Sequence, residues 1–179
     1  TKDCSIFLIE ASNTALENLI LASAVGKRRV TLKNCPQEPQ IIDLCEMLIS
    51  MGAKISGAGN KTLVIDGVEK LHGTTFRISD DYIEFATYAI AAAITSVKLK
   101  IICENLDLEP ITVILEKFGI EFLEEEDGYT VESKKLNAVE KVVTNIWPGF
   151  PTDLMSAVIV LASQANGETL CHDWMYESR

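Results

Sequence analysis

The sequence predicts an α+β protein built from repeated units of about 70 residues, and three observations lead to that prediction. The chain has 179 residues, of which 47% are hydrophobic and 23% charged, as in a folded protein with a substantial core. Helical and alternating hydrophobic patterns follow one another in the same order twice. The segment Asn-Cys-Pro-Gln-Glu-Pro at 34–39 also returns 71 residues later, as Asn-Leu-Asp-Leu-Glu-Pro at 105–110.

The first unit is predicted to contain a strand, a helix, a strand, a helix and two strands. Thr14 and Glu17 have the spacing of a capping box, which places the start of the first helix at Thr14. Pro39 suits the first turn of the second helix, and Gly52 ends it. The other elements are a strand at 4–9, the first helix at 14–24, a strand at 29–33, a turn near 57–61 between two short strands, and the second of those strands at 63–65.

The second unit repeats this order, and a third copy is predicted to begin at Asp153. The second unit has a helix at 83–94, a strand at 99–102, a helix before Gly119, and a strand pair that turns at 127–128. The third copy has a very apolar helix at 154–165 and a strand at 169–172. Because this last copy is incomplete, we expect the chain to be a piece of a longer protein.

Charge and cysteine usage disfavour several function classes. Lys and Arg total 16 against 26 for Asp and Glu, and a net charge of −10 repels nucleic acid and anionic membranes. Five cysteines are odd in number and widely spaced, and two histidines do not complete a zinc-ligand pattern. The longest apolar run, 88–94, is too short to cross a membrane. We therefore expect a cytoplasmic protein with reduced thiols, no metal or other cofactor, and no nucleic-acid or membrane partner.

Several motifs, taken in order, carry a resemblance to a known family. They are Glu38-Pro39 before a helix, Met-Gly-Ala-Lys-Ile-Ser at 51–56, Ile-Asp-Gly-Val-Glu-Lys-Leu at 65–71, Phe-Pro-Thr-Asp at 150–153 and Tyr-Glu-Ser-Arg at 176–179. Over nearly the whole chain this set resembles the enolpyruvyl transferases. The last two motifs resemble the branch that acts on UDP-N-acetylglucosamine more than the branch that acts on 3-phosphoshikimate.

The resemblance implies a fold and a domain organisation. The family fold is an inside-out α/β barrel, or α-β prism, in which each of two domains contains three βαβαββ units with helices inside and sheets outside. By this resemblance, residues 1–79 are the last unit of the first domain, which bears the catalytic loop. Residues 80–179 are one and a half units of the second domain, so the remainder of the two-domain fold is an expected partner.

The resemblance also implies a reaction, the transfer of the enolpyruvyl group of phosphoenolpyruvate to the 3-hydroxyl of UDP-N-acetylglucosamine in peptidoglycan precursor synthesis. In the family, the Lys-Asn pair that grips phosphoenolpyruvate and the loop with the reactive Cys lie upstream of the segments matched here. None of the five cysteines is therefore expected to be catalytic. The parent protein is expected to be a transferase, and these 179 residues alone are expected to be inactive.

In the first unit, the family's nucleotide-contacting segment matches Glu10, Ala11, Ser12 and Asn13. Free NH groups at a helix N-terminus suit a pyrophosphate. The family usually has Lys where Glu10 stands, which leaves the charge assistance open. An equally good explanation is that residues 12–14 only cap the helix.

In the second unit, Asp153 matches the carboxylate that bonds the sugar 3-hydroxyl and is the candidate base. The alternative is that Asp153 is only a carboxylate at a helix N-terminus, where the helix dipole favours negative charge. Met175 matches a position whose backbone lies by the uridine. Arg179 matches an arginine that closes on the substrate, although a terminal arginine is more often solvated. Tyr82 stands where the family has Arg. Because of Glu10 and Tyr82, a noncatalytic paralogue that acts as a binding module stays open beside the two enzyme branches.

Overall fold

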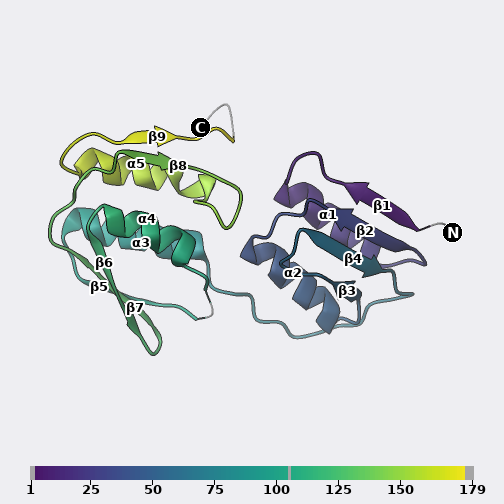
Figure 1. Ribbon diagram of the computed structural model, residues 1–179. Coiled ribbons are helices and arrows are strands. Elements are labelled where there is room, and N and C mark those ends of the chain that lie inside the picture. Colours follow the sequence, from purple (N-terminus) through teal and green to yellow (C-terminus); the bar gives the residue numbers. More distant parts are fainter. Residues whose placement is uncertain (1–2, 105, 176–179) are drawn as a thin grey trace. The chain divides into compact units, whose positions relative to one another are not determined.

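The computed structural model describes residues 3–104 and 106–175, and the chain divides into two compact units, 1–79 and 80–179 (Figure 1). Each unit has a hydrophobic core of its own. Among the described residues, no helix is both long and apolar enough to cross a bilayer.

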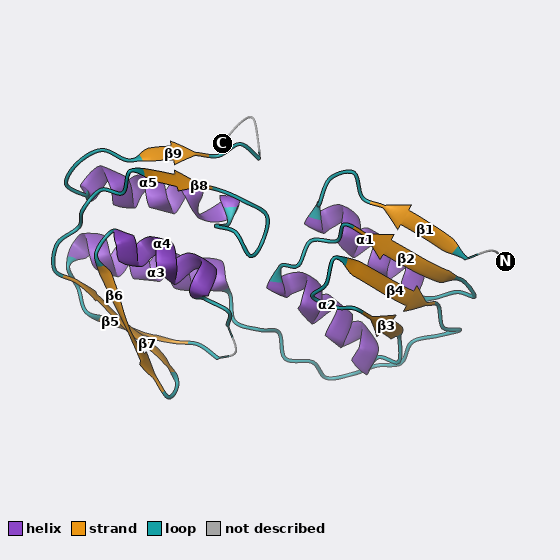
Figure 2. Ribbon diagram, viewed as in Figure 1, coloured by secondary structure: helices purple, strands orange, loops and turns teal. Residues whose placement is uncertain are grey.

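The first unit contains one four-stranded sheet with the strand order β1-β2-β4-β3 (Figure 2). Strands β1 and β2 are parallel and are connected through α1, whereas the other two pairings are antiparallel. This is the predicted order of elements. Their bounds are β1 Cys4–Phe7, α1 Asn13–Ala24, β2 Arg29–Lys33, α2 Pro39–Ser50, β3 Lys54–Ser56 and β4 Thr62–Asp66.

The core of this unit lies between the helices and one face of the sheet. Side chains alternate between the two faces of a strand, and Val30 and Leu32 of β2 are buried while the residues beside them are more exposed. The neighbouring strand β4 buries Leu63 and Ile65 in the same way. Each helix adds one apolar stripe. The buried helical residues are Leu16, Ile20 and Ala24 in α1, and Ile41, Cys45 and Leu48 in α2.

The start of α1 differs from the prediction. Ser12 is the N-cap, and its hydroxyl accepts a hydrogen bond from the Ala15 NH at 3.4 Å. Thr14 lies inside the helix, so the capping box with Glu17 is wrong. The physical reason is that Ser12 already has the extended backbone that an N-cap requires, so the helix begins directly after it.

The second unit contains an antiparallel sheet with the order β5-β7-β6 and a separate parallel pair, β8-β9. The three-stranded sheet repeats the arrangement of β2, β4 and β3 in the first unit. The elements are α3 Tyr82–Thr95, β5 Leu99–Ile102, α4 Glu109–Lys117, β6 Ile120–Glu125, β7 Gly128–Ser133, β8 Lys141–Val143, the 3-10 turn η1 Thr152–Leu154, α5 Met155–Gln164 and β9 Leu170–His172.

The third copy of the repeat begins at β8, so the prediction that it begins at Asp153 is wrong. Strand β8, helix α5 and strand β9 repeat the parallel β1-α1-β2 arrangement. Strand β8 has three residues, of which only Val142 is buried, and so it shows no alternating pattern long enough to read. Together the elements make a mixed α/β fold with open sheets, and no sheet of the described residues closes into a barrel.

Aromatic side chains fill the core of the second unit. Phe85 of α3 packs against Phe122 of β6 and Tyr129 of β7, with ring centroids 6.0 and 5.5 Å apart. Such pairs add to the stability that burial alone provides. The N-cap of α3 is Asp81, whose carboxylate accepts from the NH groups of Ile83 and Glu84.

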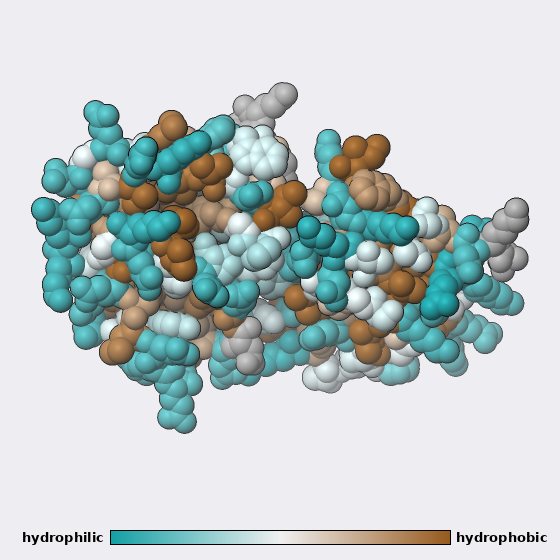
Figure 3. All heavy atoms as spheres, viewed as in Figure 1, coloured by the Kyte–Doolittle hydropathy of each residue, from teal (hydrophilic) through white to brown (hydrophobic). Residues whose placement is uncertain are grey.

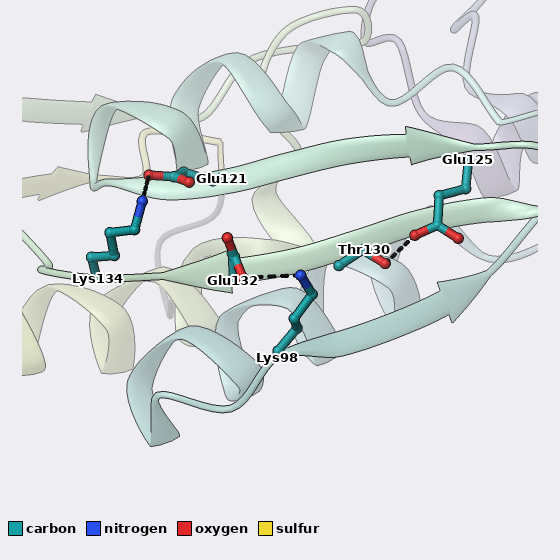
Figure 4. A network of polar contacts seen from close by, with 6 residues as sticks. All are labelled: Lys98, Glu121, Glu125, Thr130, Glu132 and Lys134. Atoms are coloured by element: carbon teal, nitrogen blue, oxygen red, sulfur yellow. Dashed lines mark hydrogen bonds and ion pairs between the residues drawn. The ribbon is translucent and has the colours of Figure 1, made fainter.

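Hydrophilic side chains cover much of the visible surface of both units (Figure 3). On the β5-β7-β6 sheet, Lys134 pairs with Glu121 and Lys98 with Glu132, and Thr130 donates to Glu125 (Figure 4). Lys100 lies 3.0 Å from Glu125 and 2.7 Å from Asp127, and its hydrogen bond lowers the pKa of Asp127. Exposed ion pairs of this kind contribute little to stability.

Candidate functional site

The segment 10–13 lies between β1 and α1, and one backbone and one side-chain hydrogen bond at Leu8 fix its entrance. The Leu8 NH donates to the Lys33 carbonyl at 3.0 Å, and the Asn34 amide donates to the Leu8 carbonyl at 2.9 Å. Asn34 has φ of 61°, a conformation that Asn tolerates better than most residues. Glu10 is exposed, and its carbonyl accepts from the Ser12 NH at 2.9 Å. The segment is therefore a short turn that delivers Ser12 to the start of α1.

Asn13 and Glu38 form a partly buried polar pair in the first unit. Glu38 precedes α2 at its N-cap but makes no side-chain cap bond. Desolvation by burial raises the pKa of Glu38, and hydrogen bonds from its own NH, the Asn13 side chain and the Gln37 NH oppose this shift. Asn13 Oδ1 and Glu38 Oε2 are buried and have no hydrogen-bond partner among the described residues. The sequence pointed to Glu38 only as part of a repeated Glu-Pro motif.

In the second unit, residues 145–153 form the candidate loop. The Asn145 NH donates to the Phe150 carbonyl at 2.9 Å, and the Gly149 NH donates to the Ile146 carbonyl at 2.7 Å. A Cβ at Gly149 would lie 2.4 Å from Asn145 Cβ, closer than atoms can approach. Glycine is therefore required at this position by the tightness of the loop.

Aromatic packing holds the candidate loop on α3. Trp147 is 8% exposed, and its ring centroid lies 5.0 Å from that of Tyr82. Tyr82, which by the resemblance stands in place of an Arg, is buried in the core against the loop. Sequence reasoning did not find this contact, because the two residues are far apart in the chain.

Asp153 lies in η1, one residue before the N-cap of α5. Its side chain is exposed, while the flanking Leu154 is buried and donates its NH to the Pro151 carbonyl at 3.2 Å. The caps of η1 and α5 are Pro151 and Leu154, which make no side-chain cap bonds. The arrangement thus presents a carboxylate at the surface end of a stiff turn.

One carboxylate connects this turn with Met175. The Asp173 side chain accepts hydrogen bonds from the Thr144 hydroxyl at 2.8 Å, the Thr152 hydroxyl at 2.5 Å and the Met175 NH at 3.0 Å. We call these four residues the Asp173 cluster. Through it the structure brings the Asp153 turn and Met175 together. Arg179, the other candidate in this unit, lies outside the described residues.

A groove of about 590 Å³ lies beside the candidate loop, where α4 and the loop meet β8. Its lining residues include Pro110, Val113, Asn145, Pro148 and Phe150. Most of the lining residues are therefore apolar, and Asp107, Glu109 and Asn145 are the polar ones.

All five cysteines are free thiols. Burial raises the pKa of Cys45 to about 11, and it also raises the pKa of Cys35, so both stay protonated and unreactive at neutral pH. Within residues 3–104 and 106–175, no three His, Cys, Asp or Glu side chains are grouped closely enough to hold a metal ion.

Comparison with known proteins decides the family. Residues 1–172 match the family described as EPSP synthase (3-phosphoshikimate 1-carboxyvinyltransferase). The chain belongs to the EPSP synthase family. This confirms the resemblance to enolpyruvyl transferases that the ordered motifs carried.

Relatives within the EPSP synthase family share much of this sequence. The chain is 42% identical over 183 residues to UDP-N-acetylglucosamine 1-carboxyvinyltransferase of Treponema denticola, an alignment that covers 97% of the chain and 43% of the relative. It is also 42% identical to the protein of that name from Gluconobacter oxydans, with 97% and 42% covered. The chain therefore spans less than half the length of these curated relatives.

A solved structure shows the same fold. The enolpyruvyl transferase NikO from Streptomyces tendae superimposes with a TM-score of 0.83 at 24% identity, covering 99% of this chain and 45% of NikO. At this identity the likeness is evidence for the fold alone. The arrangement of helices and open sheets described above is therefore an arrangement found in enolpyruvyl transferases.

Proposed function

We propose that these residues belong to a UDP-N-acetylglucosamine 1-carboxyvinyltransferase, a cytoplasmic enzyme of peptidoglycan precursor synthesis. The observation that carries the proposal is the 42% identity over 97% of the chain to a protein of that name. The enzyme would transfer the enolpyruvyl group of phosphoenolpyruvate to the 3-hydroxyl of UDP-N-acetylglucosamine. The family description itself refers to 3-phosphoshikimate, which makes the shikimate reaction the second candidate.

The proposal includes a domain organisation. Residues 1–79 would be the last βαβαββ unit of the first domain, and residues 80–179 would be one and a half units of the second. The remainder of both domains would complete two α-β prisms. The repeated strand orders β2-β4-β3 and β5-β7-β6 support such units.

In the proposed mechanism, Asp153 accepts the proton of the sugar 3-hydroxyl as that oxygen attacks phosphoenolpyruvate. An exposed carboxylate on a stiff turn is suited to this role because it reaches substrate without losing its orientation. The backbone at Met175 would contact the uridine, and Glu10, Ala11, Ser12 and Asn13 would contact the nucleotide. Arg179 would close on the substrate, and residues outside this chain would hold phosphoenolpyruvate.

Phosphate release by the purified full-length protein tests the proposal. We expect phosphoenolpyruvate to release phosphate with UDP-N-acetylglucosamine and not with 3-phosphoshikimate. The reverse preference would establish the second candidate. UDP-N-acetylglucosamine binding without turnover of either acceptor would establish a noncatalytic binding module.

The 179 residues alone are expected to release no phosphate. We also expect them to bind UDP-N-acetylglucosamine with a Kd weaker than about 1 μM, because two of the three units of the first domain and half of the second would lie outside these residues. Turnover by this chain, free of host enzyme, would show that the catalytic groups lie within it.

A further inference from the structure

We propose that Asp173 is a positioning residue that holds the Asp153 turn and the Met175 backbone in register, an inference that rests on the proposed function. Asp173 itself is one step removed from the substrate in this scheme. It acts through Thr152, which precedes the candidate base, and through the NH of Met175, the candidate uridine contact. Neither role follows from the family motifs, in which Asp173 has no assigned part.

Contacts at the ends of β8 and β9 hold Asp173 in place. Thr144 follows β8, is fully buried, and donates its hydroxyl to Asp173 Oδ1 at 2.8 Å. The Thr144 NH donates to the His172 carbonyl at 3.2 Å, and the Trp174 indole NH donates to the Thr144 carbonyl at 2.7 Å. The residues on both sides of Asp173 are thus bonded to one buried residue, which fixes the carboxylate.

From this fixed point, the two oxygens of Asp173 reach two parts of the candidate site. Oδ2 accepts from the Thr152 hydroxyl, and Oδ1 accepts from the Met175 NH two residues further along the chain. The second bond is an Asx turn, which sets the backbone direction at Met175. Hydrogen bonds to an ionised carboxylate are stronger than neutral ones. One side chain therefore sets both the orientation of η1 and the path of the backbone at Met175.

Such a link matters for chemistry because the reacting groups must be held within a fraction of an ångström. A misplacement of 1 Å can cost about a hundredfold in rate. Without its bond to Asp173, the Thr152 side chain would no longer tie η1 to β9, and Asp153 would sample positions from which it cannot take the proton.

The test compares Thr152→Val with Thr152→Ser in the full-length enzyme, because valine removes the hydroxyl and serine keeps it. We expect Thr152→Val to lower kcat by about tenfold to a hundredfold and to change KM for UDP-N-acetylglucosamine by less than about threefold. Thr152→Ser should restore most of kcat. Asp173→Ala should lower kcat and also raise KM, since it removes the Met175 turn as well.

Thr130→Val is the matched control. Thr130 is buried whereas Thr152 is half-buried, but its hydroxyl likewise donates to a carboxylate, that of Glu125, in the same unit (Figure 4). It should lower Tm about as much as Thr152→Val while kcat stays within about twofold of the wild type. If Thr152→Val and Thr130→Val have the same kcat, or if Thr152→Ser is as impaired as Thr152→Val, the positioning role is refuted.

Amide hydrogen exchange separates this inference from the proposed function, because it needs no turnover. In the full-length protein, Asp173→Ala should speed exchange in peptides containing residues 150–155 and 173–175, and Thr130→Val should not. An inactive wild-type protein with this exchange pattern would refute the proposed function and keep the positioning role. Unchanged exchange in Asp173→Ala would refute the positioning role whatever the activity.

Discussion

The two candidate site regions are built in different ways. At segment 10–13, the Ser12 cap that begins α1 joins residues only three apart, although Leu8 before the segment also contacts Lys33 and Asn34 at the end of β2. The candidate loop is held by side chains distant in sequence, since Thr152 and Thr144 meet Asp173 across 21 and 29 residues. The comparison teaches that the start of α1 is a local product of its sequence, whereas the candidate loop exists only when the whole unit has folded.

The largest expected effect is that of Asp153→Asn in the full-length enzyme, which we expect to lower turnover by about a hundredfold or more. Asparagine keeps the size and one acceptor oxygen but cannot take the 3-hydroxyl proton. Phosphate release measures the loss, and an unchanged Tm shows that folding survives. Asp127→Asn is the control, because Asp127 is exposed in the turn between β6 and β7, which the structure places at 126–127 and not at the predicted 127–128, and asparagine suits a turn as well as aspartate does. Near-normal turnover in Asp153→Asn would leave only a role at the helix start.

Gly149→Ala should break the candidate loop and leave the first region intact. The added Cβ would lie 2.8 Å from the Ile146 carbonyl oxygen as well as against Asn145, so we expect a destabilisation of about 2 kcal/mol together with lower turnover. Denaturant unfolding measures the first effect. Gly73→Ala is the matched control, because nothing lies within 4 Å of a Cβ there. Equal stabilities of the two variants would mean that the loop relaxes without cost.

Ser12→Ala tests the local character of the first region. Loss of the cap should destabilise the first unit by about 1 kcal/mol or less, since the cap bond is exposed and long at 3.4 Å. Chemical denaturation measures the change, with Ser50→Ala as a control that replaces a helical serine without removing an N-cap. A loss well above 2 kcal/mol would show that Ser12 is held by more than its own helix.

The smallest expected effect concerns Glu38→Gln and depends on pH. Burial raises the folded-state pKa above the unfolded value, so protonation favours folding and this contribution is lost as the pH rises through the folded pKa. A neutral glutamine should therefore stabilise the protein at pH 7 by less than about 1 kcal/mol and make no difference near pH 4. Urea unfolding at both pH values measures this, beside the exposed Glu46→Gln. Destabilisation at pH 7 would mean that the bonds from Asn13 and the backbone outweigh burial.

The sequence predicted most of the elements correctly, because their signals are local. Strands β2 and β5 occupy the predicted ranges 29–33 and 99–102, and α1 begins one residue before its prediction. Strand β8 was missed, since three residues with one buried side chain carry no periodicity. Its partner β9 lies beyond a whole helix, and only the folded unit brings the two together.

The candidate site likewise has parts that the local sequence predicts and parts that only the folded unit brings together. Motif matching predicted roles for Asp153 and Met175, and these stay predictions. Ser12 does cap α1, as its bond to the Ala15 NH shows. The contacts that hold the candidate loop were missed, because nothing in the local sequence connects Tyr82 with Trp147 or Asp173 with Thr152. Such pairs follow from the register of strands and the packing of helices, which a single sequence does not specify residue by residue.

The two tryptophans of the chain, Trp147 and Trp174, give the second unit a built-in optical signal. Trp147 is only 8% exposed and packs against Tyr82. Trp174 is 55% exposed and donates its indole NH to the Thr144 carbonyl. The Trp147 indole therefore emits from a buried environment and the Trp174 indole from a solvent-exposed one. Both tryptophans lie beside the candidate loop or the Asp173 cluster, and the sequence of the first unit has none. The emission wavelength and quenching of tryptophan fluorescence therefore report the state of that site and not that of the first unit.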